Sequence, residues 1–350
     1  MRSDANSSSN YYPLFDYLRI ILSITVMLSH DGLIFWSDGG NFAVQVFFAL
    51  SGWLIGGMLM DASKADLPRF YFNRALRIWV PYYLALGLLI CASLMKDTPT
   101  SKWVEFVFYK ATFVYNLFGT RQLTDFWSLM PLDGTGNHFW SVNAEEQFYL
   151  LVPILLVLIV PLGRSLLLWF LIAAAAWWLE IYASIVFGVL AAVLARKVGP
   201  IHAFAPARVV SFGGVVVFSS ALVTGMDYYA WAPLLAICIV LLLAVPGKPT
   251  PLGKFVGGIS YPLYLNHWIG VFAGHALMGP FGMRDTPERQ LLSALLNIGI
   301  AAALYWLVDW RILAMRNGWF TPERGRMAMW LGYGVTGTGL IVGLALANLP

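Results

Sequence analysis

The sequence has few charged residues. Asp, Glu, Lys and Arg together make up 11% of its 350 positions, against roughly 25% in typical soluble domains. Hydrophobic residues account for 59%, more than a soluble chain of this length would need for its core, and they leave little polar surface. This shortage of charge excludes an ordinary soluble enzyme and indicates a chain that lies largely in a membrane.

Cysteine is also scarce. Cys91 and Cys238 both lie in apolar segments, where a cysteine is typically a small buried hydrophobic residue, so we expect no disulfide and no metal site. The Ser- and Asn-rich start lacks the basic region and short apolar core of a signal peptide. We interpret residues 1–12 as a flexible cytoplasmic tail. Residues 13–350, which contain no repeat and no soluble segment, are interpreted as one transmembrane domain.

Long apolar runs are abundant, and about eleven of them approach the ~20 residues that a membrane helix needs. They predict an all-α, polytopic integral membrane protein of about 10–11 transmembrane helices. Two short runs, 165–179 and 181–195, meet at Glu180 and are either a tight hairpin or one broken helix. Residues 103–118 carry two charges and predict an interfacial helix instead of a span. The candidate spans are 17–36, 41–60, 78–95, 139–160, 165–179, 181–195, 208–226, 230–246, 255–279, 290–308 and 327–348.

The basic residues are distributed unevenly between the two sides of these spans. With the N-terminus in the cytoplasm, sixteen of the 22 Lys and Arg residues fall on the cytoplasmic side and six on the outer side. Cytoplasmic loops of membrane proteins carry such an excess. The net charge of +4 therefore reflects topology, and it offers no argument for binding nucleic acid.

Arg19 and His30 are ionisable residues in the first apolar run. Such residues are costly inside a membrane helix and mark a candidate functional site. Their spacing of eleven residues is close to three helical turns, which puts both on one face, roughly 16 Å apart along the axis. Asp16 and Ser23 fall near the same stripe. A neutral imidazole in a dry pocket can act as a general base; alternatively, Arg19 snorkels and His30 hydrogen-bonds a neighbouring helix.

Three other segments combine polar residues at helical spacing. Arg74 and Arg77 are three residues apart, and paired guanidinium groups suit phosphate, although inner-end arginines also anchor topology and contact anionic lipid. Glu145 and Glu146 would point about 100° apart on a helix, and either could orient an imidazole or bind sugar hydroxyls. One of them could also be solvated at the interface. The third set, Ser260, Tyr264 and His267, shares a face that could equally be a polar seam between helices.

The second apolar run is rich in small residues. Ser51, Gly52, Gly56 and Gly57 permit close approach of two backbones. We expect this to be a packing device that presses the second helix against the helix that carries His30.

Taken together, these segments resemble the membrane acyltransferase-3 family, which O-acylates cell-surface and secreted glycans in bacteria. The matching segments occur in the family's order, with three departures: Trp53 replaces a Phe, Val142 replaces a Leu, and one extra residue precedes Pro81. The segments that carry the resemblance are Asp16 to Arg19 with His30, Gly40 to Trp53, Arg69 to Tyr82, Trp140 to Tyr149, and Ser260 to His267.

The resemblance implies a bundle of about ten helices in the bacterial inner membrane, with no bound cofactor. It would use cytoplasmic acyl-CoA, usually acetyl-CoA, as co-substrate and a glycan or glycolipid as acceptor. Its further partners would be membrane lipids and polysaccharide-synthesis machinery. His30 would be the essential imidazole and Arg19 its motif partner, with Glu145 or the adjacent Glu146 as further catalytic candidates. The implied substrate-binding residues are Asp16, Arg74, Arg77, Trp140, Ser141, Tyr261, Tyr264 and His267.

Two other functions fit a polar stripe inside a membrane: a glycan transporter or flippase, and a structural subunit of a polysaccharide-synthesis complex. For the enzyme, His30 would lie roughly 21 Å along its helix from Asp16, past the middle of a ~30 Å hydrocarbon core. We expect a continuous polar passage, with the thioester entering from the cytoplasm. The acceptor hydroxyl would reach His30 beside Glu145, whose charge would stabilise the protonated imidazole. No motif distinguishes an acyl-enzyme from direct transfer.

Overall fold

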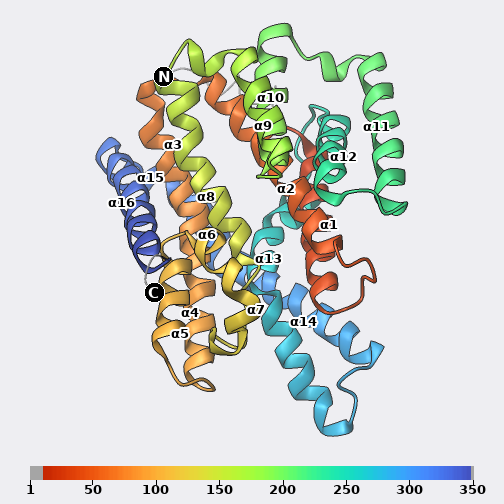
Figure 1. Cartoon of the computed structure of the whole chain (residues 1–350), viewed down its shortest axis with the longest axis vertical. Coiled ribbons are helices and arrows are strands. Elements are labelled where there is room, and N and C mark those ends of the chain that lie inside the picture. The colour runs from red at the N-terminus through yellow and green to blue at the C-terminus, as the bar shows by residue number, and fades with distance from the viewer. Residues whose placement is uncertain (1–10, 348–350) are drawn as a thin grey trace.

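The computed structural model describes residues 11–347, and their regular elements are all helices (Figure 1). Most of the predicted tail at 1–12 lies outside the described residues. Six helical segments in the described part are long and apolar enough to cross a membrane, and the all-α, polytopic fold is confirmed. Each predicted run coincides with a helix: α1 Pro13–His30, α2 Gly39–Asp61, α4 Val80–Leu94, α8 Phe139–Pro153, α9 Leu166–Trp178, α10 Ala183–Val198, α11 Ala205–Val223, α12 Tyr228–Leu243, α13 Pro251–Met278, α14 Pro287–Leu304 and α16 Pro322–Ala347.

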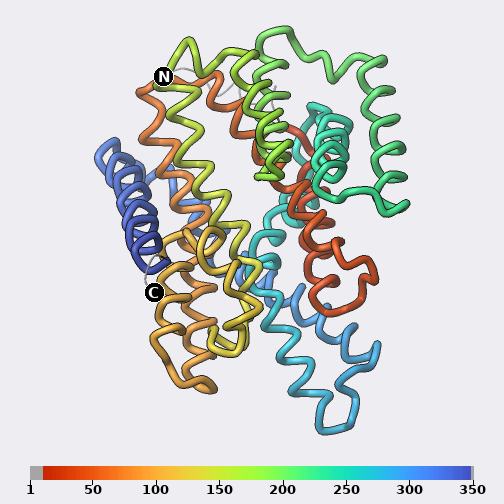
Figure 2. Tube along the Cα trace, in the orientation of Figure 1, coloured from red at the N-terminus to blue at the C-terminus, as the bar shows by residue number. Residues whose placement is uncertain are grey.

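The connections between these helices alternate between two ends of the bundle. The α8–α9 and α10–α11 connections lie at the upper end of Figure 1, and the α4–α5 and α13–α14 connections at the lower end. The tube in Figure 2 follows the same path. This is the alternation that the sequence predicts. The assignment of the upper end to the cytoplasm stays a prediction.

The first helix is shorter than predicted. α1 ends at His30, whereas the sequence predicts a span that continues to residue 36. Gly32 follows with a φ of 74°, a left-handed conformation that glycine adopts readily and that stops a helix. His30 is therefore the last residue of α1, beside a loop, and is not placed within a longer helix as expected.

The two short runs around Glu180 form a tight hairpin, so this alternative is confirmed. α9 and α10 pack side by side, and the backbone turns through positive φ values at Glu180 and Tyr182. The predicted interfacial segment, 103–118, overlaps α5, Ser101–Ala111. Its eleven residues extend only about 16 Å, too short for a ~30 Å core.

The extra residue before Pro81 coincides with a π-helix. Residues Ala75–Trp79 form one wide turn between α3 (Leu67–Arg74) and α4. A π-turn accommodates one additional residue inside an otherwise α-helical segment, and such turns are frequent at functional sites. Two further π-turns are Ile154–Leu158, after α8, and Tyr305–Asp309, which joins α14 to α15 (Trp310–Trp319). The turns at Ala75–Trp79 and Tyr305–Asp309 supply side chains to the cavity described below.

Gly52 and Gly56 of α2 face a different helix from the predicted one. A Cβ on Gly52 would lie 2.0 Å from the carbonyl oxygen of Ile185 and 3.0 Å from Cα of Gly188. The close approach is therefore between α2 and α10, and the expectation that these glycines press α2 against α1 is wrong. Gly188 provides the complementary small residue on α10, whereas α1 contains no glycine or alanine.

Candidate active site

A large cavity of about 1350 Å³ opens among α1, α2, α8, α10, α13 and the π-turns at Ala75–Trp79 and Tyr305–Asp309. It is bordered by more basic than acidic side chains. Tyr11 and Tyr12, the last residues of the predicted tail, also line it, and the Tyr11 hydroxyl donates to the Asp16 carboxylate. The basic residues on the cavity are Arg19, Arg74, Arg77, Arg196, Lys254 and Arg316, and the acidic ones are Asp16, Asp61, Glu145 and Asp309.

Arg19 belongs with the other cavity arginines and is remote from His30. It is held by Asp16, with 3.3 Å between Nη1 and Oδ1, and it lines the same cavity as Arg74 and Arg77. Arg19 and His30 share α1 but are about 16 Å apart along its axis. The structure thus assembles three predicted residues into one cationic surface and separates Arg19 from its sequence-motif partner.

Arg74 is stacked within this cationic surface. Its guanidinium carbon lies 5.4 Å from the centre of the Tyr149 ring and 5.8 Å from that of Phe70. Its Nε is buried without a hydrogen-bond partner among the described residues. A stacked guanidinium with a free Nε–H donor is suited to binding an anion, because the rings fix its position and this donor is unused.

Three cavity cations were not predicted as site residues. In the sequence they count only toward the excess of basic residues on the cytoplasmic side; they are Arg196, Lys254 and Arg316. Arg196 forms an ion pair of 2.8 Å with Asp61, and all three border the cavity. They come from α10, α13 and α15, so only the packing of these helices brings them together.

The two adjacent glutamates face different surroundings, as their helical spacing predicts. Glu145 lines the cavity and accepts hydrogen bonds from the hydroxyls of Ser51 and Tyr149. Glu146 is 2% exposed and is not among the cavity-lining residues. Its Oε2 has no hydrogen-bond partner in the part of the chain that the structure describes. Glu145 is therefore the carboxylate available to a molecule in the cavity.

Ser141 and Tyr264 meet where the cavity reaches α8 and α13. The Tyr264 hydroxyl lies 2.5 Å from Ser141 Oγ and 2.9 Å from the carbonyl oxygen of His138. Tyr261 also lines the cavity and donates to the carbonyl of Ile78 at 3.3 Å. Trp140, by contrast, is not among the lining residues.

Trp140 packs against Phe48, with 5.9 Å between ring centres. The structure therefore does not place Trp140 on the cavity, whereas Ser141, Tyr261 and Tyr264 all border it.

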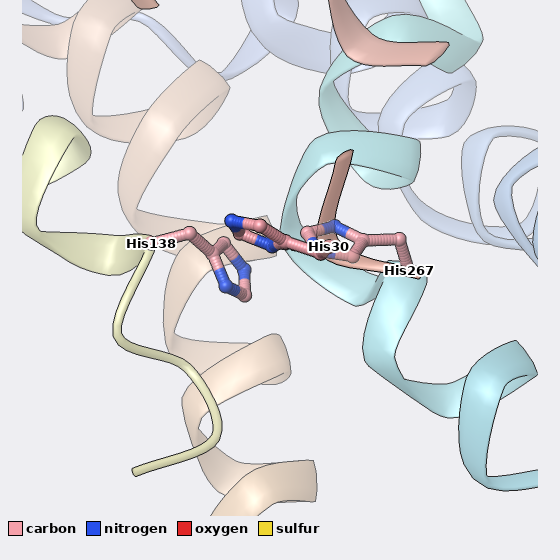
Figure 3. Close-up of side chains that lie close together, drawn as sticks. All are labelled: His30, His138 and His267. Carbon is pink, nitrogen blue, oxygen red and sulfur yellow. Dashed lines mark hydrogen bonds between the residues drawn. The ribbon is translucent and has the colours of Figure 1, made fainter. Parts of the chain in front are cut away.

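Three histidines from different parts of the chain lie close together beyond the Ser141–Tyr264 pair (Figure 3). Nδ1 of His30 is 2.8 Å from Nε2 of His267, and Nδ1 of His267 is 2.9 Å from the carbonyl oxygen of Tyr264. A carbonyl only accepts, so His267 carries its hydrogen on Nδ1 and accepts at Nε2. The hydrogen-bond network therefore assigns the donor to Nδ1 of His30 and leaves a lone pair on its Nε2.

His138 completes this histidine cluster. Its ring centre is 4.5 Å from that of His267 and 5.8 Å from that of His30, and its Nε2 is 3.2 Å from the carbonyl oxygen of Leu265. His138 was not grouped with the other two histidines from the sequence. No local spacing could have done so, since the three residues lie on α1, just before α8, and on α13.

The predicted meeting of Glu145 and His30 is not formed. Glu145 bonds to Ser51 and Tyr149, and none of the three clustered histidines is among the residues that line the cavity. The lining residues nearest the histidines are Ser141 and Tyr264, and the Tyr264 hydroxyl donates to the carbonyl of His138. The lining of the cavity does not extend to the histidines, so the continuous passage expected from the sequence is not formed.

A buried ion pair fixes the end of α1 next to His30. Arg289 on α14 donates to the Asp31 carboxylate, and both side chains are 5% exposed. Gln290 donates to the Asp31 carbonyl at 2.8 Å. Because Asp31 follows His30 directly, these contacts hold the imidazole where it meets His267. No sequence pattern predicts this pairing between residues so distant in the chain.

Comparisons with known proteins agree with this architecture. The chain is 30% identical over 156 residues to a protein named as an O-acetyltransferase from Staphylococcus aureus (strain COL), a match covering 42% of this chain and 25% of that protein. It is 27% identical over 167 residues to the peptidoglycan O-acetyltransferase OatA of Listeria monocytogenes, covering 45% and 26%. The aligned part thus spans about a quarter of these relatives. No solved structure matches.

The family comparison covers much more of the chain. Residues 12–306 match the acyltransferase domain of the acyltransferase-3 family, a range that includes α1, the π-turn Ala75–Trp79, the cavity glutamate and all three clustered histidines. The polytopic bundle described here is therefore a member of the acyltransferase-3 family.

Proposed function

We propose that this protein is an integral membrane O-acetyltransferase that moves an acetyl group from cytoplasmic acetyl-CoA to a hydroxyl of a cell-surface or secreted glycan. The observation that carries the proposal is an arrangement of two sites. One is a cavity rich in basic side chains that extends to the Ser141–Tyr264 pair. The other is a set of hydrogen-bonded imidazoles beyond this pair, at the other end of α1.

The cavity supports binding of a phosphorylated donor. Arg19, Arg74 and Arg77 come from two segments and converge on one space, and guanidinium groups bind phosphate oxygens bidentately. Lys254 and Arg316 extend the same surface. In our proposal the phosphates of acetyl-CoA bind these cations, and the thioester points toward Ser141 and Tyr264.

His30 is the proposed general base for the acceptor. Its side chain is exposed, and the hydrogen-bond network leaves a lone pair on Nε2. The acceptor O–H bond breaks as its proton passes to Nε2, and the oxygen forms a bond to the acetyl carbonyl carbon. The C–S bond then breaks, and the proton passes to the CoA sulfur. His267 orients His30 and shares the developing charge.

Direct transfer is favoured over an acyl-enzyme by the surroundings of His30. A nucleophilic hydroxyl or thiol would be expected within hydrogen-bond reach of its base. Within residues 11–347, the hydrogen-bonded partner of the His30 ring is His267, and neither Ser, Thr nor Cys bonds to it. The acetyl group would therefore go straight from CoA to the glycan once the Ser141–Tyr264 pair separates.

Because relatives from bacteria are named for peptidoglycan O-acetylation, a wall or surface glycan in the bacterial inner-membrane setting is the proposed acceptor class. The test is mass spectrometry of glycans from a deletion strain that carries wild-type protein or His30→Ala. We expect O-acetyl groups only with the wild type, and normal acetylation with His275→Ala, a control on the same helix as His267. Equal acetylation by His30→Ala, at matched protein level, would contradict the proposal.

A further inference from the structure

The histidine cluster presents nitrogen ligands without any carboxylate. One ring nitrogen from each of His30, His138 and His267 lies within 4.8 Å of the others. In the described part of the chain, none of these rings is bonded to an acidic side chain, and the nearby Asp31 carboxylate is occupied by Arg289. Neutral imidazole is a ligand for zinc and similar transition metals, whereas magnesium and calcium prefer oxygen.

In two of the rings, the nitrogen that would point away from a bound metal already contacts a backbone carbonyl, as in known metal sites. His267 donates Nδ1–H to the Tyr264 carbonyl, and His138 uses Nε2 on the Leu265 carbonyl. Metal-binding histidines almost always use their second nitrogen in this way, which sets the tautomer and orients the ring. Each of these two rings therefore keeps one nitrogen without a hydrogen, and that of His267 accepts from His30 when no metal is bound.

The spacing is close to that of a coordination sphere. Zinc–nitrogen bonds of about 2.0–2.1 Å in a tetrahedral site put ligand nitrogens about 3.3 Å apart. The cluster brackets this value, with 2.8 Å between His30 and His267 and up to 4.8 Å across the group. Side-chain rotations that move these atoms by about an ångström would complete the geometry. His30 is exposed, which provides a route of entry.

We propose that His30, His138 and His267 form a binding site for one divalent transition-metal ion of the zinc class. Three histidines leave the fourth tetrahedral position open, as in sites that bind an exchangeable water molecule. No metal site was expected from the sequence, in which the three histidines lie in separate segments without the local spacing of a metal motif.

Occupancy of this site would compete with the base role of His30, a consequence that rests on the proposed function. Nδ1 is the His30 nitrogen that faces His267. Coordination through Nδ1 places the ring hydrogen on Nε2, which then donates and can no longer accept the acceptor's proton. A bound metal ion would therefore inhibit acetyl transfer, and its removal would restore it.

Metal binding is tested on the detergent-purified full chain with an affinity tag that contains no histidine. Co²⁺ is the probe, because tetrahedral Co²⁺ absorbs in the visible range, and bound Zn²⁺ is counted by mass spectrometry after gel filtration. We expect about one ion per chain, and at least tenfold weaker binding in His138→Ala and His138→Asn. His202→Ala and His275→Ala, which alter the two remaining histidines, are the matched controls and should bind as the wild type does.

Two results would overturn the site: no tetrahedral Co²⁺ spectrum in the wild type, or equal binding by both His138 variants when gel filtration shows them folded. Competition between the metal ion and the base role of His30 is measured separately, by acetyl transfer. Zn²⁺ should lower wild-type acetyl transfer at least fivefold and a chelator should reverse this, while His138→Asn should lose the sensitivity. Activity that requires Zn²⁺ would overturn the competition. A chain that binds Co²⁺ but transfers no acetyl group would refute the proposed function and leave the metal site supported.

Discussion

Nδ1 of His30 and Nε2 of His267 lie 2.8 Å apart, so a hydrogen bond joins the last residue of α1 to the interior of α13. The same contact sets the tautomer of His30, because His267 already donates to the Tyr264 carbonyl. The candidate base is thus oriented by a ring that is itself held by the backbone. Each prediction below tests a part of the site that surrounds this pair.

The first prediction separates the base from the residue that positions it. His30→Ala should lower acetyl transfer by about 10²–10⁴-fold, the usual cost of losing a general base. His267→Ala should lower kcat by a smaller factor, while His267→Gln, which keeps an acceptor near His30, should recover part of the loss. Transfer from radiolabelled acetyl-CoA in membrane vesicles measures both. If His267→Ala changed only the KM for acetyl-CoA, its positioning role would be wrong.

The second prediction concerns the donor cations. Arg74→Gln with Arg77→Gln should raise the KM for acetyl-CoA more than it lowers kcat. The lost phosphate contacts bind the ground state and the transition state equally. Added salt should reduce the difference from wild type by screening the charges that remain accessible. Arg208→Gln is the control, since Arg208 is exposed on the same predicted side but does not line the cavity. An unchanged KM for the double variant would argue against this cavity as the donor site.

The third prediction concerns the barrier between the cavity and the histidines. Tyr264→Phe removes the hydroxyl that bonds Ser141 and His138 while keeping the ring. Water should then reach the thioester more readily, and hydrolysis of acetyl-CoA without acceptor should rise several-fold. Release of free CoA thiol measures this rate. Tyr261→Phe, also on the cavity but bonded to Ile78, is the control, and equal hydrolysis in the two variants would refute a barrier at Tyr264.

The fourth prediction concerns the ion pair beside His30. Arg289→Ala leaves Asp31 as a buried charge without its partner, and such losses typically cost about 3–5 kcal/mol. We expect a clear fall in the thermal unfolding temperature of the detergent-solubilised protein. The double variant Asp31→Leu with Arg289→Met should recover most of it, because no buried charge remains. A double variant as unstable as Arg289→Ala would show that other contacts of Arg289 are the important ones.

The fifth prediction concerns the contact between α2 and α10. A methyl group on Gly52 would lie 2.0 Å from the Ile185 carbonyl oxygen, which is backbone and cannot move away cheaply. Gly52→Ala should therefore lower the unfolding temperature or the yield of folded protein. Gly213→Ala is the matched control in a membrane helix, since a Cβ there meets nothing within 4 Å. Equal stability of the two variants would mean that the helices separate without cost.

Local pattern was enough to predict the helices. Apolar runs of the right length imply membrane helices, because the bilayer core leaves backbone groups no partner except one another. Every predicted run therefore coincides with a helix, and the hairpin at Glu180 was among the alternatives. The divergence of Glu145 and Glu146 also follows from helical geometry alone, and the structure has one on the cavity and the other away from it.

The partners of these helices could not be predicted from the sequence. Gly52 was expected to face α1, but which small residue it meets depends on the position of Gly188 on a helix formed much later in the chain. Arg19 was paired with His30 because they share a motif and a face, yet Asp16 and the other arginines determine its surroundings. Helical periodicity predicts which residues share a face of a helix, but it does not predict which other helix packs against that face.

The active site shows the same division. From its own residues the chain determines a membrane bundle, a basic end and an imidazole on the first helix. Only the tertiary structure brings His138 and His267 to His30, pairs Asp31 with Arg289, and puts Tyr264 between the cavity and the cluster. These contacts join residues more than 100 positions apart, and they exist only because the helices pack in one arrangement.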